Sequence, residues 1–322
     1  MGLLLSLGDW AKVIESIHIY PQDGPITLAQ SPKDTSVSDV SPPLYVDFAP
    51  PPYAFTPEIK GSCRGILFLH GRLKFTLWNP STGFRKQIPA SPFNSETCSL
   101  SKLYGFGYDH SRDDYLLVTF SCERTLVNPS SHLELFSFRN NRWEEIDGNY
   151  GLYYNCTSID LKGGSLCNGA IHWLTSRSYD FLEFPVDVIL AFDLLERQPV
   201  EMPLPDHNPR TRDIWIFGEF FSLWTMYNDT FKVFVMKEYK VHSSWTQTLV
   251  LRIDGVPTKN FYPVCCTKNG DIIATVNDGT ELVKLNDEGM LLGNHTYGDQ
   301  PFMFQVVMYT ESLLSLPDGD GE

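Results

Sequence analysis

One unit, a strand followed by a polar turn and a second strand, recurs along most of this 322-residue chain. Each copy begins with an apolar run, and the turns that follow these runs contain Asn79, Arg139, Asp193, Lys237 and Asn286. Successive markers are 60, 54, 44 and 49 residues apart. A loose repeat of about 50 residues that contains only strands is typical of the blades of a β-propeller, including those of kelch type.

The clearest copy is the stretch 61–89. Two apolar runs, Ile66–Leu69 and Phe75–Trp78, precede a turn at Asn79–Gly83 and a third segment at 86–89. Proline fixes φ at the start of such a turn, and glycine supplies the positive φ that a compact reversal needs. The stretch therefore predicts three antiparallel strands.

The number of copies predicts the size of the ring. Five units fit between Gly61 and about Tyr297, and the last strand, at 305–315, needs N-terminal strands to complete a sixth blade. Residues 44–48 alternate as a strand does, and we expect them to pair with residues 305–309. Such pairing removes the open edges that promote aggregation. The sequence thus predicts an all-β fold, a kelch-like β-propeller of about six blades whose ring is closed by N- and C-terminal strands.

Aromatic side chains should form many of the contacts between blades. The stretch 215–234 is the most aromatic part of the chain, and we expect its rings to pack between adjacent blades. Glycines alternate with aromatic residues at 104–108, which predicts a close approach of the backbone near the central channel. Four tryptophans flank strand–turn units and should be largely buried: Trp78, Trp143, Trp173 and Trp245.

The charge and the cysteines limit the partners and the compartment. A net charge of −14 argues against nucleic acid, because phosphate binding needs a basic face. Seven cysteines without a CxxC pair fit a reducing compartment. No apolar run has the length of a transmembrane helix or the flanks of a secretory leader. We therefore expect an intracellular protein, cytoplasmic and/or nuclear, with neither nucleic acid nor membrane among its partners.

Motifs for catalysis, cofactors or metals are not recognisable in the sequence. His172 has no Cys, Ser or carboxylate at a motif spacing, and we expect an interior histidine bonded to backbone. None of the eight histidines forms a pair at metal-ligand spacing. The chain is therefore predicted not to be an enzyme and to have no catalytic, cofactor-binding or metal-binding residues.

Several motifs occur in an order that is specific to one family. They are GSCRGILFL, LWNPSTGFRKQIP, YGFGYDHSRDDYLLV, SLCNGAIHWL, ILAFDLLERQPVEMPLP, VFVMKEYKVHSSWTQ and CCTKNGDIIA. From about Gly61 to Leu316 the chain resembles the F-box-associated domain of plant F-box proteins of the F-box/kelch-repeat type. In that family an N-terminal F-box binds a Skp adaptor of a cullin-based ubiquitin ligase, and the associated domain captures the protein to be ubiquitinated.

The N-terminal part departs from that family pattern. Residues 1–60 lack the Leu-Pro-Asp/Glu signature that opens an F-box. We expect a short helix around Asp9–Ile17, followed by a Pro-rich loop with one strand. The predicted domains are this segment at 1–60, the F-box-associated propeller at 61–316 and an acidic tail at 317–322. A Skp adaptor is expected as a partner only if an F-box lies upstream of this chain.

The resemblance implies a protein-binding module that captures target proteins of unknown identity for ubiquitination. One alternative is an adaptor or competitor without an F-box, or a truncated gene model, which binds targets without docking to a ligase. A second alternative is a sugar-binding or enzymatic propeller, which needs convergent arginines or a Tyr/His/Cys cluster. The candidate arginines are scattered instead: Arg64, Arg72, Arg142 and Arg252.

Three predicted loops contain the aromatic and arginine residues in which interface energy concentrates. These loops are 150–154, 177–181 and 207–212, and a ring can bring at least two of them to one rim. The predicted partner contacts are Tyr153, Tyr154, Tyr179, Phe181, Arg210 and Arg212.

Overall fold

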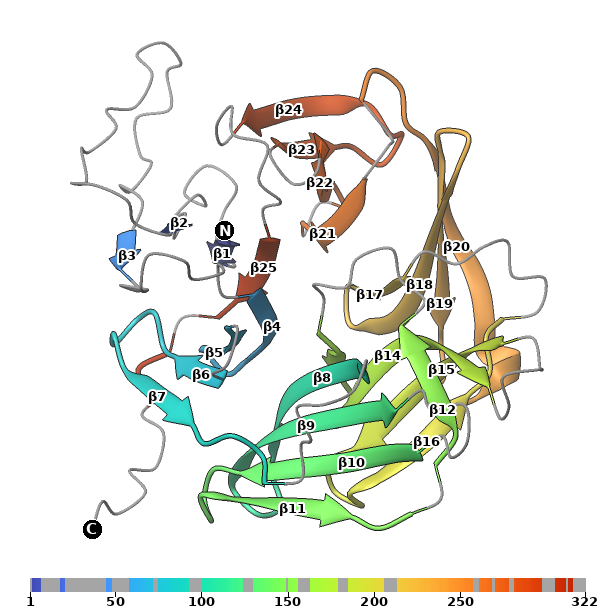
Figure 1. Cartoon of the computed structure of the whole chain (residues 1–322). Coiled ribbons are helices and arrows are strands. Elements are labelled where there is room, and N and C mark those ends of the chain that lie inside the picture. The colour runs from blue at the N-terminus through green and yellow to red at the C-terminus, as the bar shows by residue number, and fades with distance from the viewer. Residues whose placement is uncertain are drawn as a thin grey trace.

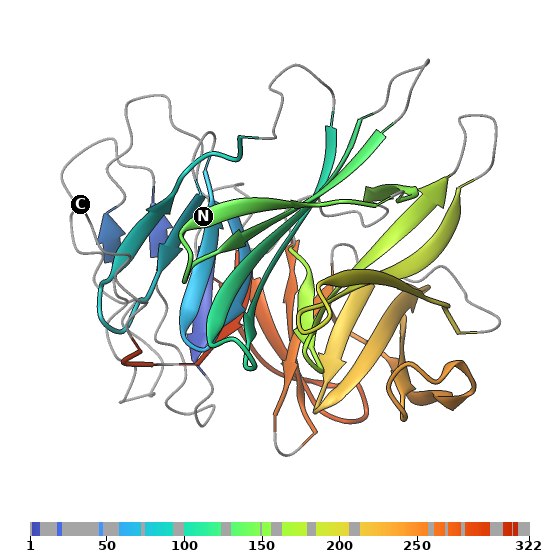
Figure 2. The ribbon, with the colours of Figure 1, turned by 90° about the horizontal axis from the view of Figure 1, so that it is seen from below.

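The computed structural model of the chain is a ring of twisted sheets (Figure 1, Figure 2). It describes residues 2–6, 18–20 and 45–47, and then 58–314 except 72–74, 93–99, 124–129, 149, 156–162, 179–184, 206–212, 257–260, 268–269, 278–280, 297–304 and 311. Within these residues there is no α-helix, and η2 (His242–Ser244) is a 3-10 turn. No helix among them is long and apolar enough to cross a membrane.

Five antiparallel sheets follow one another along the chain. The first contains β4 (Glu58–Cys63), β5 (Ile66–His70), β6 (Phe75–Trp78) and β7 (Arg85–Ile88), and the second contains β8 (Leu100–Asp109), β9 (Asp114–Glu123), β10 (Ser130–Ser137) and β11 (Arg142–Ile146). In the third, β12 (Leu152–Asn155) and β13 (Ser165–Cys167) both pair with β14 (Ala170–Ser178), followed by β15 (Val186–Asp193) and β16 (Gln198–Met202). The fourth contains β17 (Asp213–Phe217), β18 (Phe220–Tyr227), β19 (Thr230–Met236) and β20 (Trp245–Arg252), and the fifth contains β21 (Tyr262–Cys266), β22 (Ile272–Val276), β23 (Glu281–Leu285) and β24 (Leu291–Thr296).

The first strand of each sheet lies innermost, and these strands contact one another around the ring. β4 contacts β8, β8 contacts β13 and β14, both of these contact β17, and β17 contacts β21. A last strand, β25 (Gln305–Tyr309), lies between β21 and β4 and completes the circle. The predicted all-β propeller of about six blades is confirmed, with β25 in the sixth position.

The terminal strands close the ring, but the predicted partner of β25 is wrong. β1 (Gly2–Ser6), and not the segment 44–48, pairs with β25 in parallel, while β3 (Tyr45–Asp47) pairs with β2 (His18–Tyr20). Both partners in the closing pair are continuous apolar runs, three leucines opposite Val306, Val307 and Met308, which is typical of parallel strands. Asp47 interrupts the apolar pattern of β3. The expected helix at 9–17 lies outside the described residues.

The first sheet has one strand more than the predicted three. The additional strand is β4, and its pairing with β5 shifts register between Ile59 and Gly61. The polar side chain of Lys60 and the absent side chain of Gly61 break the apolar alternation that marks a strand in a sequence. This irregular strand nonetheless lies innermost in its blade.

Close packing between neighbouring sheets explains the glycines at 104–108. A Cβ built on Gly105 would lie 2.5 Å from a methyl carbon of Ile171 and 2.6 Å from the ring of Trp173. The indole Nε1 of Trp173 donates to the carbonyl oxygen of Tyr104 at 2.8 Å. The predicted close approach is confirmed, and it joins the second sheet to the third.

Three of the four tryptophans predicted to be buried are buried: Trp78, Trp143 and Trp173. Trp245 is only partly buried, because it lies at the start of the outermost strand β20. In the aromatic stretch 215–234, most rings pack between sheets as expected. Two do not: Phe220 is 49% exposed and Tyr227 is 67% exposed.

Polar turns secure the sheets as the sequence indicates. Asn168 and Gly169 have positive φ angles of 49° and 72° and join β13 to β14 in a tight hairpin. Asn79 is fully buried in the turn after β6, and its side-chain amide donates to the carbonyl oxygens of Ser312 and Leu314 at 2.9 Å each. The C-terminal segment is thereby attached to the first sheet.

Candidate partner-binding site

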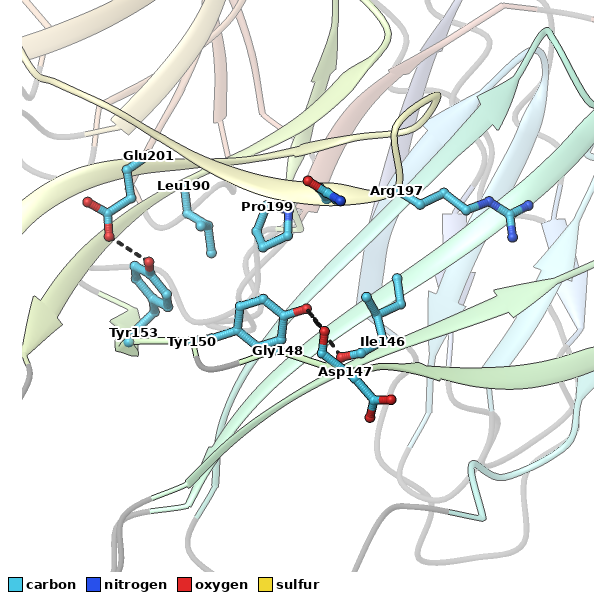
Figure 3. A pocket seen from close by; sticks show the side chains of 11 residues that line it. Ile146, Asp147, Gly148, Tyr150, Tyr153, Leu190, Arg197, Pro199 and Glu201 are labelled. Carbon is cyan, nitrogen blue, oxygen red and sulfur yellow. Dashed lines mark hydrogen bonds between the residues drawn. The ribbon is translucent and has the colours of Figure 1, made fainter.

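A pocket of about 420 Å³ lies between the second and third sheets, in what we call the second–third junction. In Figure 3 the rings of Tyr150 and Tyr153 lie on one side of it, and Leu190, Pro199 and Glu201 lie on the other. The walls come from the end of β11, from β12 and from the outer strands β15 and β16. The pocket therefore extends from β12, which contacts β8, outward to β16 at the edge of the third sheet.

Tyr150 fixes the conformation of the turn that follows the second sheet and forms one wall of the pocket. After β11 the chain turns at Asp147 and Gly148, and the hydroxyl of Tyr150 donates back to the carbonyl oxygens of Ile146 and Asp147 at 3.2 Å each. The ring of Tyr150 also packs edge-on against the buried Phe120, with centroids 5.6 Å apart. Burial raises the pKa of the Tyr150 hydroxyl, and the nearby Asp147 carboxylate raises it further. The tyrosine is therefore neutral and serves as a donor.

The opposite wall carries a carboxylate whose charge is compensated. Glu201 accepts a hydrogen bond from the Tyr153 hydroxyl at 2.6 Å through one oxygen, and it pairs with the Arg177 guanidinium at 2.5 Å through the other. All three side chains belong to the third sheet, in which Tyr153 and Arg177 are direct partners in the ladder between β12 and β14. The wall is polar without a net charge.

Two arginines connect the sheets beside the pocket. Arg197, in the turn between β15 and β16, reaches Glu144 of β11 at 3.4 Å. Arg112, in the turn before β9, donates to the carbonyl oxygen of Leu195 at 2.9 Å. The Nε atom of Arg197 is buried and has no hydrogen-bond partner among the described residues. These contacts hold the second–third junction together around the cavity.

This arrangement suits the insertion of a side chain from a partner. Ile146 and Pro199 offer apolar surface, while the tyrosines and Glu201 offer hydrogen-bonding groups at fixed positions. The lining is about equally polar and apolar, so a partner side chain that is itself partly polar would fit it.

Burial shifts the pKa values of two buried thiols and of His172. Burial raises the pKa of the Cys63 thiol to about 12 and that of Cys122 to about 11. His172 is buried as expected, with Nδ1 at 3.1 Å from the carbonyl oxygen of Ser165 and Nε2 at 2.7 Å from the Tyr239 hydroxyl. Burial lowers the pKa of this imidazole to about 4. Among the described residues no three His, Cys, Asp or Glu side chains form a metal-binding group.

The structure describes two of the six predicted contact residues, Tyr153 and Tyr154. Tyr153 lines the pocket, but the loop predicted at 150–154 is wrong, because 152–155 is strand β12 and Tyr153 is only 6% exposed. Its β-prone neighbours, Leu152 and Tyr154, are the signal for that strand. The backbone of Tyr154 pairs with Ser176 in the same ladder. Tyr179, Phe181, Arg210 and Arg212 lie outside the described residues.

Sequence reasoning did not find the pocket residues on β16. Glu201 and Pro199 alternate along that strand and so face the same side of the sheet. A polar residue at such a position is compatible with an ordinary solvent-facing site. Only the return of β12 against β14 shows that this face is partly enclosed.

Comparison with known proteins gives one family and a group of plant relatives. The family described as "F-box associated beta propeller domain" matches residues 47–315. The F-box protein CPR1 of Arabidopsis thaliana is 25% identical over 287 residues, covering 82% of this chain and 69% of the relative. An F-box/kelch-repeat protein of the same plant is 24% identical over 199 residues, covering 60% of this chain and 52% of the relative.

Solved structures align less closely. Virginiamycin B lyase from Staphylococcus aureus, in a complex with quinupristin, aligns with a TM-score of 0.42 and 12% identity over 79% of this chain and 74% of the lyase. That likeness is too weak to transfer any property of the lyase.

Proposed function

Because this chain belongs to the family of F-box associated β-propeller domains, we propose that it captures target proteins for ubiquitination by a Skp–cullin–F-box ligase. The observation that carries the proposal is the family match at 47–315, which includes every innermost strand from β4 to β25. The plant relatives are named F-box proteins, which is consistent with a substrate-recognition role.

The pocket at the second–third junction is the contact that we assign to the target. Its apolar surface can enclose an aliphatic or aromatic side chain, and buried anchors of this kind contribute most of the energy of an interface. Glu201 does not repel such an anchor, because Arg177 and Tyr153 already compensate its charge. Both sheets are fixed on either side by Arg112 and Arg197, so little ordering is needed on binding.

We propose binding, and not catalysis, as the activity of the domain. The described thiols with raised pKa values are poor nucleophiles at neutral pH. Both ring nitrogens of His172 are engaged by other groups. An intracellular location, cytoplasmic and/or nuclear, belongs to the same proposal, and the free state of the five described cysteines is consistent with it.

Capture in plant cells tests the proposal. The tagged chain is expressed, cross-linked to its neighbours and purified, and the captured proteins are identified by mass spectrometry. The informative variant is Pro199→Arg, which places a charged side chain in the pocket. The matched control is Val200→Arg, because Val200 is the next residue of β16, is 41% exposed and does not line the pocket.

We expect Pro199→Arg to reduce capture of at least one specific protein about tenfold, as loss of an interface anchor does, while Val200→Arg leaves it unchanged. Equal capture by both variants would move the contact away from this pocket. Failure of the wild-type chain to enrich any protein over an unrelated propeller would contradict the capture role itself.

Docking to the ligase is a separate question. We propose that a Skp adaptor binds only through an F-box accompanying this domain, since residues 1–60 lack the opening signature of that module. Calorimetry with the purified chain and a purified Skp adaptor should show no binding. Micromolar binding would locate a docking element within the chain and contradict this part of the proposal.

A further inference from the structure

The pocket at the second–third junction has two polar ends that differ in charge. Figure 3 shows Glu201 at one end of the cavity and Arg197 at the other. At the first end one carboxylate, that of Glu201, pairs with one guanidinium, that of Arg177. At the second end the carboxylate of Glu144 is shared by two arginines, Arg142 at 2.8 Å and Arg197 at 3.4 Å. One carboxylate cannot neutralise two guanidinium groups, so the Arg197 end keeps an excess of positive charge.

Arg197 also has a hydrogen-bond donor that the protein leaves unused. Its backbone N–H donates to the carbonyl oxygen of Asp193 at 2.8 Å, which fixes the residue in the turn between β15 and β16. The side chain is only 22% exposed, and its Nε atom is buried without a hydrogen-bond partner among the described residues. A buried N–H without an acceptor costs free energy, and a partner that supplies the acceptor recovers it. A carboxylate fits this position, because it can accept two parallel hydrogen bonds from one guanidinium.

The surroundings of Arg197 leave room for such a carboxylate and for an apolar neighbour. Asp147 lines the cavity, but its carboxylate points away from it in Figure 3. Glu196, the next residue in the turn, is exposed and does not line the cavity. Ile146 and Pro199 supply apolar surface between the two ends. A cavity of about 420 Å³ is within the size range of sites that enclose a small ligand, so it can hold more than one side chain.

We propose that the pocket binds a segment of the target protein in which a glutamate or aspartate is next to an aliphatic or aromatic residue. The carboxylate accepts hydrogen bonds from the Arg197 guanidinium, including the one from Nε, and the apolar side chain lies against Ile146 and Pro199. A lysine or arginine in place of the acidic residue is disfavoured, because a like charge then faces Arg197. The inference rests on the proposed capture function and specifies the chemistry of the captured segment.

The test uses a defined probe, the peptide Gly-Ser-Leu-Glu-Phe-Ser-Gly, in titration calorimetry with the full chain. The peptide is acetylated at its N-terminus and amidated at its C-terminus, so the glutamate side chain is its only charged group. Two control peptides replace this glutamate with glutamine or with lysine.

Two substitutions in the same ion pair should have opposite effects on binding. Arg197→Gln removes the donor, whereas Glu144→Gln removes the carboxylate that competes for it. Both break the same contact between the sheets, so a purely structural role would change binding in the same direction for both. Arg197→Lys keeps the charge without the Nε donor. The matched control is Arg112→Gln, because Arg112 also connects the two sheets, through the carbonyl oxygen of Leu195, but does not line the pocket.

We expect the wild-type chain to bind the glutamate peptide about tenfold more tightly than the lysine peptide and about threefold more tightly than the glutamine peptide. Arg197→Gln should weaken binding of the glutamate peptide about tenfold, and Arg197→Lys should weaken it less. Glu144→Gln should strengthen this binding, and Arg112→Gln should leave it within about twofold of the wild type. Melting temperatures show whether each variant is folded, and the comparison of peptides on the wild type needs no variant.

Two results would overturn the proposal: no preference of the wild type for the glutamate peptide, or equal weakening by Arg197→Gln and Glu144→Gln. The outcome is separable from that of the proposed function. If the wild type captures cellular proteins but does not prefer the glutamate peptide, the acidic anchor is wrong while the capture role stands. If the wild type enriches no protein, the capture role fails whatever the peptides show.

Discussion

Two junctions between neighbouring sheets, the second–third and the fourth–fifth, are held together in partly different ways. Each has four buried aromatic residues in its core, and in each an indole donates across the junction: Trp173 to the carbonyl oxygen of Tyr104 at 2.8 Å, and Trp215 to that of Val264 at 3.2 Å. At the second–third junction a pocket also lies between the sheets, and Arg112 and Arg197 connect the sheets beside it. At the fourth–fifth junction the described pair of Arg252 with Asp254 is exposed and lies next to β20, so it does not connect the two sheets.

This difference predicts which forces stabilise each junction. Where the sheets separate around a cavity, polar contacts between them carry part of the stability. At the fourth–fifth junction stability depends on buried area, and the surface charges contribute little to it. Removal of a charge should therefore cost more stability at the second–third junction, whereas removal of a buried ring should cost a similar amount at both.

The largest expected effect is the loss of a buried ring. Phe231→Ala removes a fully buried side chain from the fourth–fifth junction and should lower the free energy of unfolding by about 3–5 kcal/mol. Trp173→Ala, at the second–third junction, should also lower the free energy of unfolding by about 3–5 kcal/mol, because the ring of Trp173 packs on Gly105 of the second sheet. Denaturant titration measures both.

Trp245→Ala removes a ring of the same size as Trp173→Ala does, but from a partly buried position, and so serves as the control for burial. It should lower the free energy of unfolding clearly less than either substitution. A loss below about 1 kcal/mol for Phe231→Ala would show that the fourth–fifth junction is not stabilised by packing.

Acid should destabilise the third–fourth junction, which lies between the two compared. Burial lowers the pKa of His172 to about 4, whereas an unfolded histidine titrates near pH 6.5. Between these values the unfolded chain binds a proton that the folded chain does not, so stability falls as the pH falls through that window. The loss by pH 4 should reach about 3 kcal/mol. A second imidazole, the partly buried His70, has its pKa lowered to about 4, chiefly by burial, and adds to the same loss.

The variant His172→Gln separates the two histidines. Unfolding titrations between pH 7 and pH 4 should show about one proton fewer taken up on unfolding than in the wild type. An unchanged proton count would mean that His172 is protonated in the folded chain.

Charge removal should distinguish the two junctions directly. Glu201→Ala leaves Arg177 without its carboxylate partner in a half-buried site and should cost about 1–2 kcal/mol. Glu288→Ala, on the rim of the fourth–fifth junction, should change stability by less than about 0.5 kcal/mol. Thermal unfolding in low and high salt checks both. Equal losses of stability for the two variants would contradict the expected difference between the two junctions.

Much of the ring was predictable because its units are local. Apolar alternation, the hairpin at Asn168–Gly169 and the glycine turn at Gly83 are all readable within a few residues, and the structure has each of them. The motifs that resemble the F-box-associated family are confirmed by the match at 47–315.

The features that were missed depend on contacts distant in sequence. Either 44–48 or the leucine run at 3–5 was compatible with a strand beside β25, and only the assembled ring selects the second. Likewise, the pocket exists because β12 returns against β14 and places Tyr153 opposite Glu201. The exposure of Tyr227 depends on where the fourth sheet ends, which its aromatic neighbours do not reveal.

The capture role is tested most directly by the dissociation constant between the purified chain and a protein that it captures. Titration calorimetry with wild type, Pro199→Arg and Val200→Arg gives this value with both components defined. We expect micromolar or tighter binding for the wild type and for Val200→Arg, and about tenfold weaker binding for Pro199→Arg. If no captured protein binds the purified chain directly, the chain is not the target-recognising domain proposed above.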